Sequence, residues 1–252
     1  MKLVKRSFLM LLPLIIGFGC TQKVQTPEVQ NDLTMIENPQ LTYVLPSPRV
    51  EGSTSVETAI NHRRSHRSYM NDALTAEELS QVLWAAYGIS KPLQGYPQTR
   101  GGLRTAPSAG ARYPLEIYAL VGNVRGIEPG VYRYDSREHK ISRVIERDIK
   151  QELAVAALNQ EMISEAPACL FYSAVYSRTT DRYGDRGRER YVCMDLGHSA
   201  ENVYLQAEAL HLGTCAIGAF EDEAVRKVMQ LPEEEEPLYI MPIGKYYDVS
   251  EF

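Results

Sequence analysis

The segment that most constrains the fold is a long helix predicted from about residue 191 to residue 212. Its apolar residues follow helical spacing at Val192, Leu196, Val203, Ala207 and Leu210. Gly213 is a typical residue at which to end such a helix. The periodicity leaves Ala200 and Tyr204 outside the core stripe, so we expect them on a face that is available for contact with another surface. A helix with one apolar stripe has to pack against a sheet or against other helices.

Shorter helices and strands are predicted around this helix. Helices are expected at residues 55–63, 75–87, 149–163 and 222–231. Strands are expected at residues 115–121, 131–134, 140–145, 168–176 and 238–243, the second and third forming a hairpin. Because the strands do not alternate strictly with the helices, the predicted class is α+β, with helices packed against one mostly antiparallel sheet.

The first twenty residues have the pattern of an export signal. Lys2, Lys5 and Arg6 precede an apolar stretch at 8–18, which is too short for a comfortable membrane span. Cys20 directly after Gly19 resembles the lipobox of bacterial lipoproteins, although Gly17 and Phe18 depart from its usual residues. The resemblance implies a signal peptide at 1–19 and lipidation of Cys20. The alternatives are an ordinary cleaved signal or an uncleaved anchor.

The lipobox resemblance therefore predicts an exported lipoprotein, anchored to a membrane on its periplasmic or extracytoplasmic face. Residues 20–52 are polar, contain four prolines and lack a hydrophobic period, which predicts a flexible linker. The folded domain is expected at residues 53–252.

Composition excludes some classes of function. A net charge of -5 argues against a nucleic-acid partner, which would normally require a basic face. The acidic run Glu233 to Glu236, bracketed by two prolines, is predicted to be a solvated loop. Cys169, Cys193 and Cys215 are widely spaced and form no CxxC pair, so neither a disulfide framework nor a metal site is predicted.

Self-contained hydrolytic chemistry is also disfavoured. The five histidines form no HExxH pair, and the chain contains neither a GxSxG elbow nor a GxxxxGK[ST] loop. His198 would lie on the long helix, where a structural role is expected rather than that of a catalytic base.

Two segments carry the chemistry that the sequence does indicate. Arg63, Arg64, Ser65 and Arg67 gather at the end of a predicted helix, where arginine forks and a hydroxyl suit phosphate oxygens. A solvated basic helix end is the alternative interpretation. The second segment, 107–114, reads PSAGARYP, whose small residues let backbone approach a flat ring closely. Taken alone it could be a tight connection.

Together these segments resemble the nitroreductase family. The finer similarity is to its SagB-type branch, which includes azoline oxidases of ribosomal-peptide maturation. The shared motifs are RRSHR at 63–67, PSAGARYP at 107–114, LGHSAEN at 196–202 and LGTCAIGAF at 212–220. The resemblance runs in order from about residue 54 to residue 246. It implies FMN bound between two copies of the chain in a homodimer.

The resemblance also implies roles for particular residues. Arg63, Arg64, Ser65 and Arg67 would bind the phosphate and the ribityl hydroxyls. Pro107, Ser108, Ala109 and Gly110 would cover the flavin ring from the other protomer, and Ile217 and Gly218 would lie near the flavin face. Tyr183 is a candidate catalytic residue, because azoline-oxidising relatives carry a Lys-Tyr pair in this region.

The implied activity is hydride transfer through flavin N5 by a ping-pong mechanism. NAD(P)H or a redox partner would be the donor, and a nitroaromatic, quinone or activated alkene the small-molecule acceptor. Dehydrogenation of a peptide azoline is an alternative, but Arg182 replaces the expected lysine and does not readily give up a proton. A lipid-anchored flavin-binding protein without turnover is a second alternative.

Overall fold

A computed structural model describes residues 32–37 and 40–247, and its centre is an eight-stranded sheet. The strand order is β1-β2-β7-β6-β5-β8-β10-β9, and every neighbouring pair is antiparallel. The predicted α+β class with an antiparallel sheet is therefore confirmed.

The sheet is formed by β1 (Thr34–Glu37), β2 (Leu41–Val44), β5 (Leu115–Val121), β6 (Gly130–Asp135), β7 (Lys140–Ile145), β8 (Ala168–Ala174), β9 (Gly213–Thr214) and β10 (Glu236–Gly244). A separate two-stranded ribbon pairs β3 (Ile89–Pro92) with β4 (Gly102–Arg104). The helices are α1 (Val56–His62), α2 (Ala76–Tyr87), α3 (Lys150–Ala156), α4 (Met162–Glu165), α5 (Ser177–Tyr183), α6 (Val192–Ala209) and α7 (Asp222–Met229).

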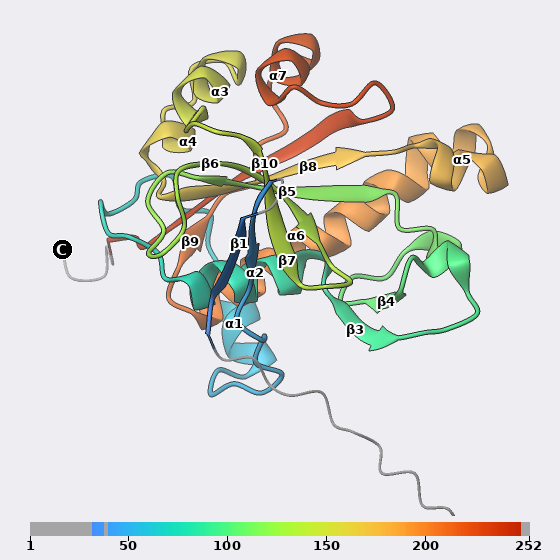
Figure 1. The fold of residues 1–252 in the computed structure, drawn as a ribbon, viewed down its shortest axis with the longest axis horizontal. Coiled ribbons are helices and arrows are strands. Elements are labelled where there is room, and N and C mark those ends of the chain that lie inside the picture. Colours follow the sequence, from blue (N-terminus) through green and yellow to red (C-terminus); the bar gives the residue numbers. More distant parts are fainter. Residues whose placement is uncertain (1–31, 38–39, 248–252) are drawn as a thin grey trace, which may run out of the picture.

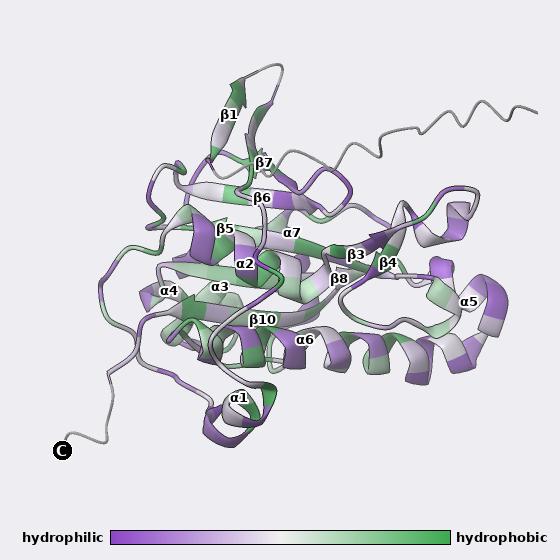
Figure 2. Ribbon diagram, turned by 90° about the horizontal axis from the view of Figure 1, so that it is seen from below, coloured by the Kyte–Doolittle hydropathy of each residue, from purple (hydrophilic) through white to green (hydrophobic). Residues whose placement is uncertain are grey.

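Helices cover both faces of the sheet (Figure 1). On one face α2 and α6 pack over the central strands, and on the other lie α3, α4 and α7. Helix α2 begins with the predicted capping box, in which Thr75 accepts the Glu78 N–H and Glu78 accepts the Thr75 N–H. Helix α6 runs along the edge of the molecule in Figure 2, so one side of the helix faces the core and another side is exposed.

The folded body begins earlier than predicted. Residues within the expected 20–52 linker form β1 and β2, and β2 pairs with β7. Leu41, Tyr43 and Leu45 are buried in the main core, where burial removes their apolar side chains from water. The prediction of a flexible linker is wrong for these residues. The predicted signal peptide and Cys20 lie outside the described residues.

Two other expectations need correction. The helix predicted at 149–163 is divided into α3 and α4, because Leu158 and Asn159 adopt left-handed backbone conformations with φ near 60°. The acidic run is not simply a solvated loop, because Glu235 is fully buried. Its carboxylate accepts hydrogen bonds from Tyr118 and Ser173. Within residues 32–37 and 40–247, no helix combines the length and the apolar character needed to cross a membrane.

Candidate functional site

The predicted phosphate-binding segment follows the C-terminus of α1. The His66 N–H donates to the Thr214 carbonyl at 2.9 Å, and Ser65 forms a parallel bridge with Thr214. An added Cβ at Gly213 would lie 2.7 Å from the His66 Cβ, so only glycine permits this approach. The fold thus brings segment 63–67 against segment 213–216, although they are far apart in the sequence.

Tyr204 of α6 joins the two segments. Its hydroxyl lies 3.2 Å from the Ser65 hydroxyl and accepts the Ala216 N–H at 2.8 Å. The Arg63 guanidinium lies over the Tyr204 ring, 5.3 Å from its centroid. The expectation that Tyr204 and Ala200 lie on a face available for contact with another surface is wrong: Tyr204 packs within this site, and Ala200 is buried in the core.

The predicted phosphate ligands have different surroundings. The Arg64 guanidinium donates to the carbonyls of Asn61 and Arg63, at 2.9 and 2.8 Å, so it caps the end of α1. Within the described part of the chain, neither Arg63 nor Arg67 forms an ion pair. The buried Thr214 hydroxyl has no hydrogen-bond partner among the same residues. This donor set fits a phosphate group.

The ring-covering segment predicted at 107–110 lies between β4 and β5, at the other end of α6. The Ser108 hydroxyl accepts the Tyr113 N–H at 2.8 Å, and the Ala109 N–H donates to the Asp195 carboxylate at 3.2 Å. Gly110 has φ of 60°, and an added Cβ would lie 2.4 Å from the Tyr183 hydroxyl. Tyr183 therefore lies against this segment, at the end of α5.

The two predicted groups of flavin ligands contact α6 at different residues. Segment 107–110 contacts α6 at Asp195, whereas segment 63–67 contacts it at Tyr204. Nine residues of helix separate these points, about 13 Å along the axis.

Ile217 and Gly218 are divided between core and surface. The Ile217 side chain is buried in the second core cluster, and its N–H and carbonyl are both bonded to Ile240. That Ile217 lies near the flavin face or its N5 edge stays a prediction, and with the side chain in the core it would apply to the backbone. Gly218 is exposed, next to the ring of Tyr239.

Asp195 is a site residue that the sequence reasoning missed. It is buried at the start of α6, and one of its carboxylate oxygens has no partner within the described residues. Burial raises the pKa of Asp195, although Ser108, the Ala109 N–H and His198 each act to lower it. A small cavity beside it is lined by Pro107, Tyr191, Met194 and the exposed His198. The sequence did hold a signal for Asp195. Helical spacing places its carboxylate on the buried side of the predicted helix, one turn before Ser199.

Comparisons with known proteins agree with this arrangement. The nitroreductase family model matches residues 60–245. MJ1384 of Methanocaldococcus jannaschii, provisionally named a nitroreductase, is 45% identical over 204 residues, which cover 81% of this chain and 97% of that protein. The trifolitoxin-processing protein TfxB of Rhizobium leguminosarum bv. trifolii is 26% identical, over 76% of this chain and 52% of TfxB.

A solved structure from Ralstonia eutropha, likewise provisionally named a nitroreductase, superposes with a TM-score of 0.70 at 26% identity. The alignment covers 88% of this chain and 98% of that one. The matched region contains segments 63–67, 107–110 and 213–216, whose packing is described above. The chain belongs to the nitroreductase family.

Proposed function

We propose that the protein is an FMN-dependent oxidoreductase in which two copies of the chain share each flavin. The observation that carries the proposal is the donor set at the end of α1. The guanidiniums of Arg63 and Arg67 form no ion pair with a described residue, and the buried Thr214 hydroxyl nearby is unpaired. A phosphate monoester beside segment 63–67 would supply the counter-charge that these guanidiniums lack.

The protein's part would be binding and orientation. FMN, when bound, supplies the hydride chemistry that no side chain provides. Arg63, Ser65 and Arg67 would hold the phosphate and the ribityl hydroxyls. Pro107 to Gly110 of the partner subunit would cover the ring, and Asp195 would fix that segment through the Ala109 N–H. Asp195 is thus a positioning residue in this proposal.

The proposed homodimer rests on the family resemblance, which places segment 63–67 of one copy and segment 107–110 of the other on one flavin. Helix α6 offers a face for this contact, since its exposed residues recur along one side at Cys193, Met194, Gly197, His198 and Glu201. This face replaces the one expected from the sequence.

The proposed reaction passes electrons from NAD(P)H to a small acceptor such as a nitroaromatic, quinone or activated alkene. Azoline dehydrogenation is a second candidate, supported by the similarity to TfxB and by Tyr183 packing on Gly110. Arg182 weakens this candidate, since a guanidinium keeps its proton where a desolvated lysine can release it.

One experiment separates these functions. The purified protein should show a flavin absorption spectrum, and NADPH or NADH should bleach it without oxygen. A nitroaromatic or quinone should then restore the colour. Flavin that neither nucleotide bleaches, but that an azoline peptide reduces, would identify the dehydrogenase. Flavin that no donor reduces would identify a binding protein without turnover. Protein that cannot take up FMN would contradict the proposal.

We also propose the lipid anchor at Cys20, which rests on the sequence pattern alone. Cys20→Ser should release the protein from the membrane fraction or leave its signal uncleaved, because this thiol is the only attachment proposed. Cell fractionation with mass spectrometry of the N-terminus checks this. Unchanged processing together with unchanged membrane association would rule out the anchor.

A further inference from the structure

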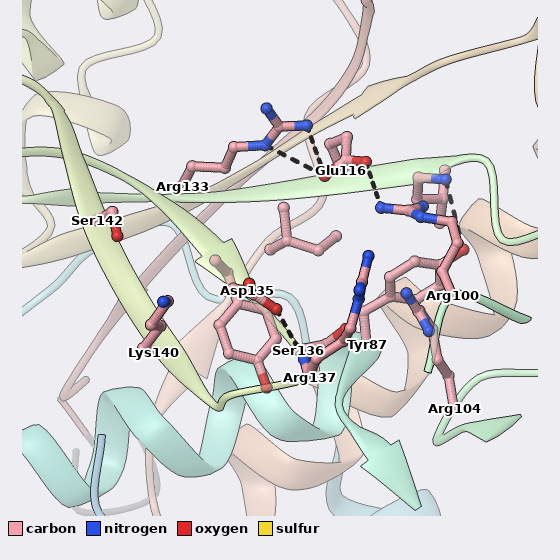
Figure 3. A pocket seen from close by; sticks show the side chains of 13 residues that line it. Tyr87, Arg100, Arg104, Glu116, Arg133, Asp135, Ser136, Arg137, Lys140 and Ser142 are labelled. Carbon is pink, nitrogen blue, oxygen red and sulfur yellow. Dashed lines mark hydrogen bonds and ion pairs between the residues drawn. The ribbon is translucent and has the colours of Figure 1, made fainter. Parts of the chain in front are cut away.

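A second arginine-rich site lies away from the predicted flavin ligands. A cavity of about 290 Å³ lies where β5 begins and where β6 turns into β7, beside the segment that leads into β4 (Figure 3). Its basic side chains are those of Arg100, Arg104, Arg133, Arg137 and Lys140. None of the residues proposed to bind FMN lines it.

Glu116 balances only part of this charge. Its carboxylate lies 2.8 Å from Arg100, 3.1 Å from Arg133 and 2.6 Å from Arg178. Burial alone would raise the pKa of Glu116, but the three guanidiniums together hold it below its ordinary value. One buried carboxylate is thus shared by three cations, and among the described residues only Arg133 has a second carboxylate partner, Glu235 at 3.3 Å.

Arg104 is the least compensated cation. Its side chain is sandwiched between the rings of Tyr87 and Tyr113, with centroid distances of 4.8 and 4.5 Å. The residue is 7% exposed, its Nε has no hydrogen-bond partner, and it forms no ion pair with any described residue. A buried charge without a counter-charge is costly, so the site favours an added anion.

The other charged groups around the cavity do not cancel this excess of positive charge. Arg137 forms no ion pair within the described chain, and Figure 3 shows its guanidinium directed toward the same space as that of Arg104. Asp135 adds a second carboxylate to the lining and accepts the backbone N–H of Arg137, so two carboxylates face the five cations that line the cavity. Lys140 is paired with Glu138 at 2.7 Å.

We propose that this cavity binds the phosphate or carboxylate group of a small anionic metabolite. Guanidinium forks match the paired oxygens of both groups. The volume is at the lower end for ligand pockets, which limits the ligand to a small molecule. Ile117 and the tyrosine rings provide an apolar wall for its carbon skeleton.

The cavity is also connected to the ring-covering segment. Arg100 donates to the Tyr113 carbonyl at 2.9 Å, and Arg104 lies on the Tyr113 ring. The Tyr113 N–H in turn donates to Ser108. An anion that changes the positions of these guanidiniums would also change the position of segment 107–110, which is proposed to cover the flavin. This consequence rests on the proposed function.

The test is calorimetric titration of the purified, FMN-saturated protein in phosphate-free buffer, with inorganic phosphate and succinate as separate probes. We expect at least one probe to saturate. Arg137→Gln should weaken the binding of that probe about tenfold or more, because one charge-assisted hydrogen bond is lost. Arg104→Lys, which keeps the charge but removes the fork, should weaken it as well.

Two variants serve as controls. Arg125→Gln removes an exposed arginine at the opposite end of β5 and β6, and should leave binding unchanged. Arg63→Gln alters the proposed FMN phosphate site and should also leave binding of the anion probe unchanged. Saturation by phosphate alone identifies a phosphate ester, and saturation by succinate alone a carboxylate.

Three results would overturn the proposal. They are no saturation by either probe, equal weakening by Arg125→Gln and Arg137→Gln, or binding lost in Arg63→Gln but kept in Arg137→Gln. The measurement does not require turnover, so its result does not depend on whether NAD(P)H reduces the bound flavin.

Discussion

Arg63 and Arg64 are adjacent in the sequence, but their guanidiniums have different partners. Arg64 caps α1 through two carbonyls, while Arg63 lies over Tyr204 without a carboxylate partner in the described chain. The helix-capping interpretation and the phosphate interpretation therefore apply to different residues of one cluster.

This contrast gives a prediction for FMN affinity. Arg63→Ala should weaken FMN binding by about 1.5–3 kcal/mol, the net value of hydrogen bonds to a charged group. Arg64→Ala is the matched control and should cost less than about 1 kcal/mol, because it removes only a cap on an exposed helix end. Fluorescence titration of the apoprotein with FMN measures both. Equal losses, or an Arg63 variant that binds as tightly as the wild type, would remove the basis for this site.

Asp195 gives a second prediction at the residue scale. Because burial raises its pKa, the native state holds this proton more tightly than the unfolded chain does. The resulting stability is present at low pH and is lost as the pH rises through the native pKa. Asp195→Asn should therefore be more stable than the wild type at pH 7, while its amide oxygen can still accept the Ala109 N–H.

Thermal unfolding of this variant between pH 3.5 and 7.5 is the measurement. The difference from the wild type should shrink toward the acid end, where the wild-type carboxyl is protonated. Asp181→Asn, at an exposed position on α5, should show no comparable trend. Greater stability of the wild type at pH 7 would contradict the account.

At the scale of elements, His139 connects the N-terminal segment to the rest of the fold. It follows β6 and lies just before β7, and its ring bonds Tyr134 through Nδ1 and Ser80 and the Pro46 carbonyl through Nε2. Burial lowers the pKa of His139 to about 4, although the bond to Pro46 acts to raise it. Its neutral ring thus helps hold the chain entering from β2 against α2.

Acid should weaken this connection. Stability from a neutral His139 is fully present above the unfolded pKa of 6.5 and is lost as the pH falls toward 4. Between pH 7 and pH 4.5 the free energy of unfolding should fall by about 2 kcal/mol from this group. His139→Phe should remove that component of the pH dependence, and His211→Gln, at an exposed position, should keep it. Denaturant titrations of the wild type and of both variants at the two pH values measure this difference.

The elements that sequence predicted well carry local signals. Thr75 and Glu78 mark the start of α2, and the seven-residue apolar run 115–121 becomes β5 with its bounds unchanged. Strands β1 and β2 lack such signals, since they are short and lie among prolines, and β2 is stabilised by pairing with a strand about one hundred residues away. Local periodicity cannot report such a long-range contact.

The same limit applies to the site. The arginine cluster and the small residues at 107–110 were identifiable from composition and from the family resemblance. The roles of Tyr204 and Asp195 were not, because each depends on which side of α6 faces segment 63–67 or segment 107–110. The orientation of Ile217 was hidden for a related reason: pairing with Ile240 turns its side chain into the core.

At the scale of the whole molecule, the central claim is that one flavin is held by segment 63–67 of one protomer and segment 107–110 of its partner. Within one chain these segments contact α6 nine positions apart, at Tyr204 and at Asp195. A second copy packed on the exposed face of α6 would complete two equivalent sites. Binding of FMN should then stabilise the dimer by an amount that grows with its free concentration.

The most direct test of this claim combines two damaged subunits. Arg63→Ala removes a phosphate ligand, and Ser108→Trp blocks the ring segment, so each homodimer should have no working site. A shared arrangement predicts that the isolated heterodimer contains one intact and one doubly damaged site. It should therefore bind one flavin and show about half the activity of the wild-type dimer. A heterodimer with no flavin and no activity, or a fully active monomer by light scattering, would contradict the account.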